Sequence, residues 1–554
     1  MLNFLYKKVL RRIFFQNKCN FRRLLLSCDH IFFIRTLSIA RKQENKEIDG
    51  RLKNFFKEKI EPYPRIEYDE KYIEICSAIN TWKDKLKNGE RVLNGKEVTI
   101  RGRIFSIRSA SSKLFFYDIY AFGAKIQSVC SLQTYKDDAS IFLKMNKNLR
   151  RGDIVEMTGI LGKTNLGEFS IFTSKIQLLA PCLHSLPSKV KNVEKHIKNR
   201  FVDFLVHPEI SNSIILRSKI LTYIREFLLN RNFLEVETPI LSGSTGGANA
   251  RPFYTHANSL DGRRILLRIA PELWLKKLVI GGFDKVFEIG KCFRNEGLDS
   301  SHNPEFTICE FYQTYISLND LIEITKSLLS GLIKELTNNN LLKGNILSLV
   351  NNSFFDTYKI LDFIPSLENR LGTSLPNLDL PSAVDDLLNI ASEKNIPLLK
   401  PYTVNRILDQ FSTQLLVSEC NQPTFIIHHP QVMSPLSKSS TRHNQNIAYR
   451  GELYILKKEI CNFYEEENAP LQQNLKFLRQ QQDRDHHGDS DIQLIDSTYI
   501  DALEWGLPPT GGWGMGIDRL CMLLSNQQQI NEILTFGNLR MTCSTAKSLS
   551  QSTN

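Results

Sequence analysis

The chain has 554 residues, which is more than a single hydrophobic core usually holds, so two or three domains are expected. Its composition, 42% hydrophobic and 23% charged, is that of a globular protein, and no stretch approaches the roughly 20 apolar residues that a membrane-spanning helix needs. The eleven cysteines occur singly, without a Cys-x-x-Cys spacing, which argues against both a zinc cluster and a disulfide framework.

The net charge of +12 is concentrated at the N-terminus. Ten Lys and Arg residues stand in the first 43 positions against Asp29 alone, so this segment carries +9. A basic, acid-poor segment with short apolar patches is typical of an organelle transit peptide, and we predict one over residues 1–45. The mitochondrion is the expected destination, with plastid or apicoplast as alternatives and the cytosol less favoured. A basic extension that helps to hold nucleic acid stays open, whereas Asp29 and His30 interrupt the apolar run of a secretory signal.

A barrel of short strands is expected after a charged region, 46–95, that should form short helices and a linker. Strands separated by glycines are predicted at 98–100, 104–105, 114–119, 125–129, 153–157 and 169–172. This spacing is typical of a small β-barrel, of which the OB-fold is a common form, and we predict one over residues 96–182. A Pro-punctuated, Lys-rich linker at 183–205 should then lead into a second domain at 206–545, followed by a polar tail at 546–554.

Two long strands joined by a polar loop are predicted inside the second domain. Residues 285–289 and 307–312 have strand character, and the loop between them carries Arg294, Glu296, His302, Asn303 and Phe306. These side chains could present a guanidinium to a phosphate and a ring to a purine face, which is a nucleotide site without a Walker loop. For any one of them, a solvated hairpin stays the alternative.

Other parts of this domain give weaker signals. Apolar residues at helical spacing predict a helix over 212–230. Residues 335–420 should be a helical insertion with no recognisable chemistry, and His486 and His487 stand in a polar, Gln-rich run that favours a solvated loop over a metal site. Glu452 and Glu459 are seven positions apart, so they converge only if the chain turns near Lys457.

Three segments, taken in order, resemble the signature segments of the class II aminoacyl-tRNA synthetases. They are Asn232–Pro239, Phe293–Tyr312 and the Gly-rich Leu507–Arg519. The sequences of Gln422–Leu436 and Glu452–Asn468 resemble those of the lysyl-tRNA synthetases, and the resemblance covers roughly residues 60–540. It implies an α+β multidomain chain: an N-terminal OB-fold β-barrel, then a class II catalytic domain with an antiparallel sheet flanked by helices. It also implies ATP-dependent ligation of L-lysine to tRNA(Lys) through a lysyl adenylate, in organellar translation, and a homodimer built around the helix at 212–230.

The resemblance assigns roles residue by residue. ATP would be bound by Arg294, Glu296, His302, Asn303, Phe306, Glu452, Glu459 and Arg519, with Arg294 and Arg519 catalytic and Mg²⁺ held by Glu452 and Glu459. L-lysine would be bound by Gly247, Glu272, Glu310, Tyr312, Asn462 and Glu466. The anticodon would be read by Arg108, Phe116, Gln127 and Glu168.

The physical reason to expect lysine as the substrate is the presence of glutamates that could pair with its side-chain ammonium group. A buried ammonium without a partner is costly, so a long cationic side chain needs carboxylates at its far end, and two convergent glutamates there would repel aspartate. Glu466 lies in the run Glu465–Glu467, so a register shift by one stays open, as does which of Phe115 and Phe116 faces the barrel core. Phe463 and Glu465 depart from the family pattern, where glycine and a small hydroxyl residue are usual.

Two other classes of function stay open. One is a synthetase-derived RNA-binding protein without catalysis, against which the intact arginines and glutamates argue. The other is an enzyme that attaches lysine to a protein, although such relatives typically lack the barrel predicted at 96–182.

Overall fold

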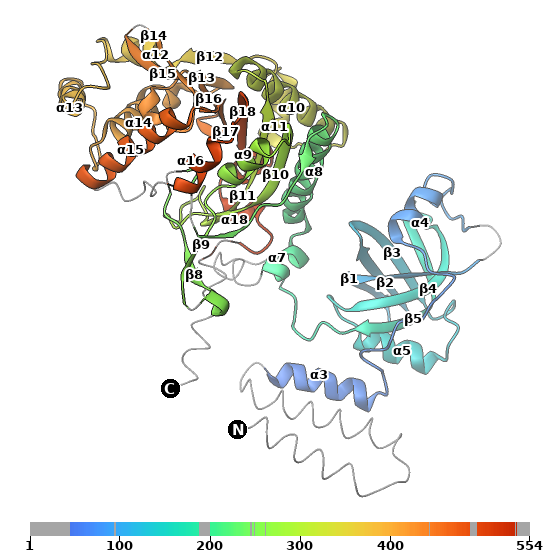
Figure 1. Cartoon of the computed structure of the whole chain (residues 1–554). Coiled ribbons are helices and arrows are strands. Elements are labelled where there is room, and N and C mark those ends of the chain that lie inside the picture. The colour runs from blue at the N-terminus through green and yellow to red at the C-terminus, as the bar shows by residue number, and fades with distance from the viewer. Residues whose placement is uncertain are drawn as a thin grey trace, which may run out of the picture. The chain divides into compact units, whose positions relative to one another are not determined.

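The computed structural model describes residues 45–92, 96–187, 200–243, 246–248, 250–260, 262–442, 444–487, 496–537 and 539 (Figure 1). The predicted transit peptide up to residue 44 and the polar tail lie outside the described residues. The chain divides into two compact units, residues 1–188 and 189–554. None of the described helices is long and apolar enough to cross a membrane.

The first unit is built on a closed five-stranded barrel, as predicted. Its strands follow the order β1-β2-β3-β5-β4. They are β1 (Val98–Ser111), β2 (Leu114–Ala121), β3 (Ala124–Ser131), β4 (Ile154–Lys163) and β5 (Phe169–Ala180), and the helices are α3 (Asn45–Lys57), α4 (Ile75–Trp82) and α5 (Ala139–Asn148). The strands expected at 98–100 and 104–105 form one continuous strand, β1, which pairs with both β2 and β4. This arrangement is the OB-fold that the strand spacing indicated.

Alternation along β2 decides which phenylalanine faces the barrel core. Phe115 lies 6.4 Å from Tyr117 and 6.0 Å from Phe142 between ring centroids, and both of those residues are buried. Because side chains alternate along a strand, Phe116 points away from this core, where it pairs in register with Arg108 of β1.

The second unit is built on an eight-stranded sheet of order β12-β13-β16-β17-β18-β11-β10-β6. Neighbours are antiparallel except the parallel pairs β6–β10 and β12–β13. The strands are β6 (Leu234–Glu235), β10 (Lys285–Phe293), β11 (Glu305–Thr314), β12 (Lys359–Asp362), β13 (Thr424–Ile427), β16 (Arg450–Ile455), β17 (Lys458–Glu465) and β18 (Thr510–Gly516). Two small sheets accompany it, one of β7 (Leu241–Ser242), β8 (Tyr254–His256) and β9 (Arg264–Leu267), the other of β14 (Ser439–Arg442) and β15 (Gln445–Ala448). The predicted hairpin is confirmed as β10 and β11.

One face of the large sheet carries the main hydrophobic core. Helices α8 (Ser211–Leu229), α10 (Leu318–Asn338) and α17 (Ile517–Leu524) supply apolar residues that cluster with Phe311, Phe463 and Trp513 from the sheet. Phe311 and Trp513 stack with ring centroids 4.9 Å apart, and the Trp513 indole donates a hydrogen bond to Thr325 on α10 at 2.9 Å. The opposite face of these strands is left for the functional site.

The remaining helices lie in the same unit. They are α7 (Arg200–Val206), α9 (Glu272–Ile280), α11 (Gly344–Asn351), α12 (Phe363–Leu371), α13 (Ala383–Glu393), α14 (Val404–Leu415), α15 (Pro470–His487), α16 (Ser497–Leu503) and α18 (Ile530–Ile533). Two of them differ from expectation. Helix α7 begins inside the predicted linker, and α15 covers most of the Gln-rich run expected as a loop, because Gln, Leu, Lys and Arg are good helix formers.

Candidate active site

A cavity of about 770 Å³ opens on the face of the large sheet opposite the main core. Its floor comes from alternate residues of three adjacent strands: Glu310 and Tyr312 of β11, Asn462 and Tyr464 of β17, and Gly512, Gly514 and Gly516 of β18. The intervening residues, such as Phe311, Phe463 and Trp513, belong to the core on the other side. The alternating glycines of β18 therefore leave space over the middle of the sheet.

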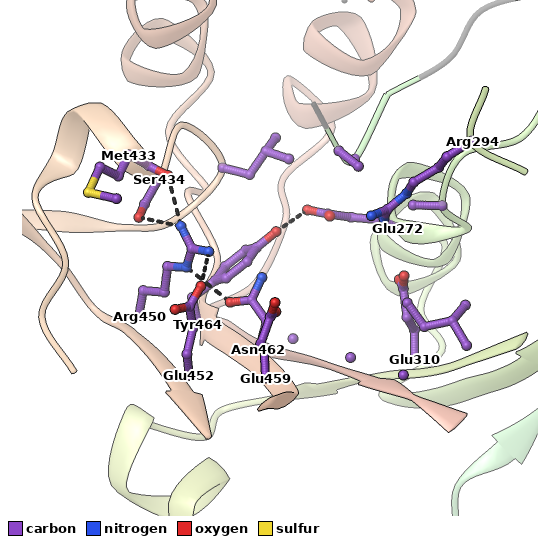
Figure 2. Close-up of a pocket in the computed structure, with 18 of the residues that line it drawn as sticks. Glu272, Arg294, Glu310, Met433, Ser434, Arg450, Glu452, Glu459, Asn462 and Tyr464 are labelled. Carbon is purple, nitrogen blue, oxygen red and sulfur yellow. Dashed lines mark hydrogen bonds and ion pairs between the residues drawn. The ribbon is translucent and has the colours of Figure 1, made fainter. Parts of the chain in front are cut away.

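Glu452 and Glu459 both line this cavity (Figure 2). The chain turns at Leu456 and Lys457, which have φ of 49° and 64°, as the convergence of the two carboxylates requires. A register shift then pairs Tyr454 with Glu459 but Leu453 with Cys461. Because this bulge adds one residue to β17, Glu459 and Asn462 face the same side although they are three positions apart.

Glu452 is held by three neighbours. Arg450 pairs with its Oε1, while Oε2 accepts from His429 Nε2 at 3.2 Å and from the Tyr454 hydroxyl at 2.9 Å. Burial opposes ionisation of this carboxyl, but Arg450 and His429 outweigh it and keep the Glu452 pKa below its ordinary value. Arg450 also donates to Asn462 at 3.0 Å and to the Met433 carbonyl at 2.8 Å, which fixes the wall of the cavity (Figure 2).

Arg519, in the first turn of α17, reaches the same region. It lies 3.0 Å from Glu459 Oε2 and donates to His302 Nε2 at 3.0 Å. Because a guanidinium only donates, His302 accepts through Nε2 and carries its proton on Nδ1, which lies 2.7 Å from Asp299. Partial burial of Asp299 is outweighed by the Ser301 N–H and the His302 ring, which lower its pKa to about 2.

The hairpin loop and the start of β11 contribute the other predicted nucleotide residues, all of which line the cavity: Arg294, Glu296, His302 and Asn303 from the loop and Phe306 from β11. The Arg294 guanidinium lies 5.0 Å from the centre of the Phe306 ring. The guanidinium and the ring therefore lie side by side, so that the first could bind a phosphate and the second could stack on a purine.

A group of acidic side chains marks the other end of the cavity. The Glu272 carboxylate accepts from the Tyr464 hydroxyl at 2.5 Å, and Gly247, with φ of 88°, lies so close that a Cβ there would be 2.8 Å from Glu272 Cβ. Glu310 is 5% exposed and accepts from the Tyr312 hydroxyl at 3.1 Å. Burial, followed by the Glu272 charge, raises the Glu310 pKa to about 8.

Glu466 lies behind the cavity wall rather than on it. Its Oε2 pairs with Lys276, and a Cβ at Gly512 would fall 1.9 Å from its Oε1. The neighbouring glutamates point elsewhere: Glu465 accepts from the Leu318 N–H at 2.9 Å, and Glu467 pairs with Lys476 at 2.6 Å. Within the run, Glu466 is therefore the glutamate directed toward the acidic end of the cavity.

The two departures from the family pattern do not enter the cavity. Phe463 is fully buried in the main core, where its ring lies 6.0 Å from that of Phe425. Gly451 makes room for it, since a Cβ there would be 2.6 Å from the Phe463 ring. Glu465 is likewise directed toward α10, so Asn462 keeps its place on the floor.

In the first unit, three of the four predicted anticodon residues share one outer face of the barrel. Arg108 pairs in register with Phe116, with the guanidinium 5.9 Å from the ring centre. Gln127 pairs with Asp118, two positions from Phe116, and accepts from Ser170 at 3.1 Å. Glu168 is exposed in the turn before β5, and its carbonyl accepts from the same Ser170 hydroxyl.

Several residues in and behind the cavity wall were not anticipated from the sequence. Lys276 is buried behind the wall, where it pairs with Glu466. The others line the cavity: Arg450, Tyr464, His429, Asn405, Arg406 and Asp409. The spacing of Lys276 four residues after Glu272 was a usable signal, since such residues share a helix face. Asn405, Arg406 and Asp409 come from α14 in the predicted insertion, which carried no motif; burial, then Glu452, raises the Asp409 pKa.

The donor set suits a hard cation. Glu452 and Glu459 offer carboxylate oxygens, and Mg²⁺ is usually held by one or two carboxylates together with phosphate oxygens. No group of three or more His, Cys, Asp or Glu residues arranged for a metal occurs in the described part of the chain. The residues thus fit Mg²⁺ bound jointly with a nucleotide better than a cage built by protein alone.

Comparison with known proteins places these features in context. Residues 192–540 match the family model described as tRNA synthetases class II (D, K and N), and residues 98–179 match an OB-fold nucleic acid binding domain. A mitochondrial lysine–tRNA ligase of Schizosaccharomyces pombe is 40% identical over 504 residues, covering 89% of this chain and 93% of the relative. A probable cytoplasmic lysine–tRNA ligase of Encephalitozoon cuniculi is 36% identical, covering 92% and 97%, and a lysine–tRNA ligase of Clostridium tetani is 36% identical, covering 83% and 90%.

Proposed function

Because this chain belongs to the class II tRNA synthetases, and within them to the lysine–tRNA ligases, we propose that it joins L-lysine to tRNA(Lys) through a lysyl adenylate in the translation system of an organelle. The observation that carries the lysine assignment is the acidic end of the cavity. Glu310 is buried there beside the Tyr312 hydroxyl, and none of the described cationic side chains forms an ion pair with it. A substrate ammonium would supply the missing partner.

The first step needs little covalent help from the protein. The carboxylate of lysine is ionised at neutral pH, so its oxygen attacks the α-phosphorus of ATP without a general base, and the bond to pyrophosphate breaks. Arg294 would bind the substrate carboxylate and the α-phosphate, and Arg519 the γ-phosphate, so that both offset the charge of the transition state. Glu452 and Glu459 would hold Mg²⁺, which neutralises phosphate charge when bound.

The ends of the two substrates would be fixed by the remaining predicted residues. Phe306 would stack on adenine, with Glu296, His302 and Asn303 around the nucleotide. The Gly247 carbonyl and Glu272 would hold the α-amino group, and Asn462 would help to hold the carboxylate. Glu310, Tyr312 and Glu466 would surround the ε-ammonium.

The second step transfers lysine to tRNA. A hydroxyl of the terminal adenosine, the 3′ one in this class, would attack the carbonyl carbon of the adenylate and release AMP. Arg108, Phe116, Gln127 and Glu168 on the barrel would read the anticodon, where Phe116 offers a face for an unstacked base. The half-buried Phe116 ring, on the strand face that it shares with Arg108, supports this role.

We also propose a homodimer. Exposed apolar side chains gather on the segments around α8 and the small sheet: Leu229, Leu234, Ile240, Leu241, Tyr254 and Leu260. Strand β6, which carries Leu234, is one of the two edge strands of the large sheet. An apolar surface beside a sheet edge is the kind of surface that proteins cover by association.

The organellar location is proposed from the basic N-terminal segment and is supported by the mitochondrial relative in Schizosaccharomyces pombe. A fusion of residues 1–45 to a fluorescent protein should enter mitochondria. Import into a plastid would change the organelle, and a diffuse cytosolic signal would remove the transit peptide.

The reaction itself is tested by amino-acid-dependent ATP/pyrophosphate exchange with all twenty amino acids. Exchange with lysine alone is the expected result, because only lysine brings two ammonium groups to the acidic end with the right chain length. Exchange with aspartate or asparagine would keep the class and overturn the lysine assignment. Absence of exchange with any amino acid would favour a non-catalytic RNA-binding protein.

A further inference from the structure

Lys276 is a fully buried cation at the acidic end of the cavity. It stands on α9, four residues after Glu272, so both side chains project from one face of the helix. Its Nζ lies 2.6 Å from Glu272 Oε1 and also contacts Glu466 Oε2. The side chain has no exposed surface, so water contributes nothing to its solvation and the two carboxylates must.

Three tyrosine rings complete the surroundings of this ammonium. Its Nζ lies 6.0 Å from the ring centre of Tyr312, 5.5 Å from that of Tyr464 and 5.7 Å from that of Tyr499. Aromatic faces attract cations, so the enclosure favours a charged lysine over a neutral one. The two carboxylates raise the Lys276 pKa despite its burial, which agrees with a charged state.

The charges at this end do not balance within the protein. Glu272, Glu310 and Glu466 are three buried carboxyl groups, and Lys276 is the one described cation that pairs with any of them. The nearby pair of Lys476 and Glu467, also buried, is by contrast balanced one to one. When all three carboxyl groups are ionised, two carboxylate charges are therefore left over beside the cavity, and such a surplus of buried charge favours a cationic ligand.

We propose that Lys276 is a specificity-determining residue, whose ammonium takes up one of three buried carboxylate charges and leaves two for the two ammonium groups of a diamino acid. This inference rests on the proposed function and explains its selectivity by counting charge. The carboxylate of the substrate falls to Arg294, so the bound amino acid and the site neutralise one another. A neutral or acidic amino acid would leave one or two carboxylates without a partner.

The number of unpaired carboxylate charges predicts that one substitution compensates for another. K276M removes the resident cation and leaves three surplus charges, whereas E466Q leaves one. The double variant K276M/E466Q restores two. If charge balance decides, the double variant has a lower KM for lysine than either single variant; if Lys276 only supports the structure, the two losses add.

The experiment measures lysine-dependent ATP/pyrophosphate exchange for the full chain and these three variants, with KM determined for both lysine and ATP. We expect K276M to raise the KM for lysine by about tenfold or more, with less than about a threefold change for ATP, and K276R to stay close to the wild type. K476M is the matched control: it removes the other buried lysine and should lower Tm while leaving the KM for lysine unchanged.

The outcomes distinguish failure of the proposed function from failure of the role of Lys276. No exchange by the wild type removes the proposed function and this inference together. Exchange by the wild type with an unchanged KM for lysine in K276M, or a double variant worse than both single ones, overturns the role of Lys276 and leaves the function standing. If K276M fails to fold, the comparison of E466Q with the double variant still decides, because the double variant should bind lysine more tightly.

Discussion

Arg519 lies 3.0 Å from Glu459, so the arginine proposed for the γ-phosphate and a carboxylate proposed for Mg²⁺ neutralise one another across the cavity. The pair joins the start of α17 to β17, and His302 extends it by accepting from Arg519 at 3.0 Å. Both side chains are therefore oriented before the nucleotide binds, which reduces the reorganisation that binding a triphosphate would require.

The first prediction concerns Arg519. Arg519→Met should lower kcat for ATP/pyrophosphate exchange by about 100-fold or more, because it removes a positioned cation from developing phosphate charge. The KM for lysine should change little. Arg519→Lys is the matched variant: it keeps the charge but not the fork of donors that reaches both Glu459 and His302, so we expect intermediate activity. Equal activity of Arg519→Met and the wild type would remove this arginine from the chemistry.

The second prediction concerns pH. The Glu310 pKa of about 8 is above the ordinary value, so near pH 7 this carboxyl is mostly protonated and binding of an ammonium requires it to ionise. The KM for lysine should therefore fall as pH rises from 6 to 8, by up to about tenfold per pH unit. In Glu310→Gln the KM for lysine should be high and nearly independent of pH over this range, while the KM for ATP stays close to that of the wild type. A wild-type KM for lysine that is constant from pH 6 to 8 would contradict the role of Glu310.

The framework of the site could be predicted from the sequence, because it depends on patterns within short segments of the chain. The hairpin β10–β11, the turn at Lys457 and the passage from β18 into α17 each follow from strand alternation, glycine content and helix periodicity. From the sequence, Glu452 and Glu459 could be predicted to converge only on the condition that the chain turns between them. The bulge that also brings Asn462 to the same face depends on pairing between strands, which periodicity along one strand does not reveal.

What the sequence could not reveal was decided by contacts between distant segments. The outward face of Phe116 became clear only from the packing of Phe115 against Phe142. Helix α14 lines the cavity together with Glu452 and Tyr454 of β16, although no motif in residues 335–420 indicated this. Lys276 was not singled out from the sequence, because the carboxylate of Glu466 that faces it is 190 positions away along the chain.

A third prediction tests how Arg519 is held in place. The preceding residue, Asp518, is buried; it lies 2.5 Å from Arg217 of α8 and accepts from the Thr307 N–H at 2.9 Å. Arg217→Met should destabilise the protein by about 3–5 kcal/mol, because Asp518 is left buried without its charged partner. Arg225→Met, on the same helix, breaks the more exposed pair with Glu235 and should cost less than about 1 kcal/mol. Denaturant unfolding measures both; similar losses would contradict the structural role of the buried pair.

A fourth prediction concerns the exposed apolar surface near β7. Leu241 is 52% exposed and neighbours Ile240, which is 43% exposed. Leu241→Asp should shift the protein from dimer to monomer in sedimentation analysis, because a charge would be buried at the interface without a partner. Leu399→Asp, at an even more exposed leucine in the insertion, is the control and should leave the sedimentation unchanged. A wild-type protein that sediments as a monomer would remove the dimer proposal.

The last prediction separates tRNA recognition from adenylate formation. Phe116→Ala should raise the KM for tRNA in aminoacylation by about tenfold or more, since stacking of one base on an aromatic ring contributes roughly 1–3 kcal/mol. Exchange of ATP with pyrophosphate should stay at the wild-type rate, because no tRNA takes part in that step. Phe122→Ala is the matched control: Phe122 is 75% exposed on the same barrel but lies in the turn between β2 and β3, beyond the strand face shared by Arg108, Phe116 and Gln127. If both substitutions weakened tRNA binding equally, the barrel would hold tRNA through general contacts, and the anticodon assignment of this face would be wrong.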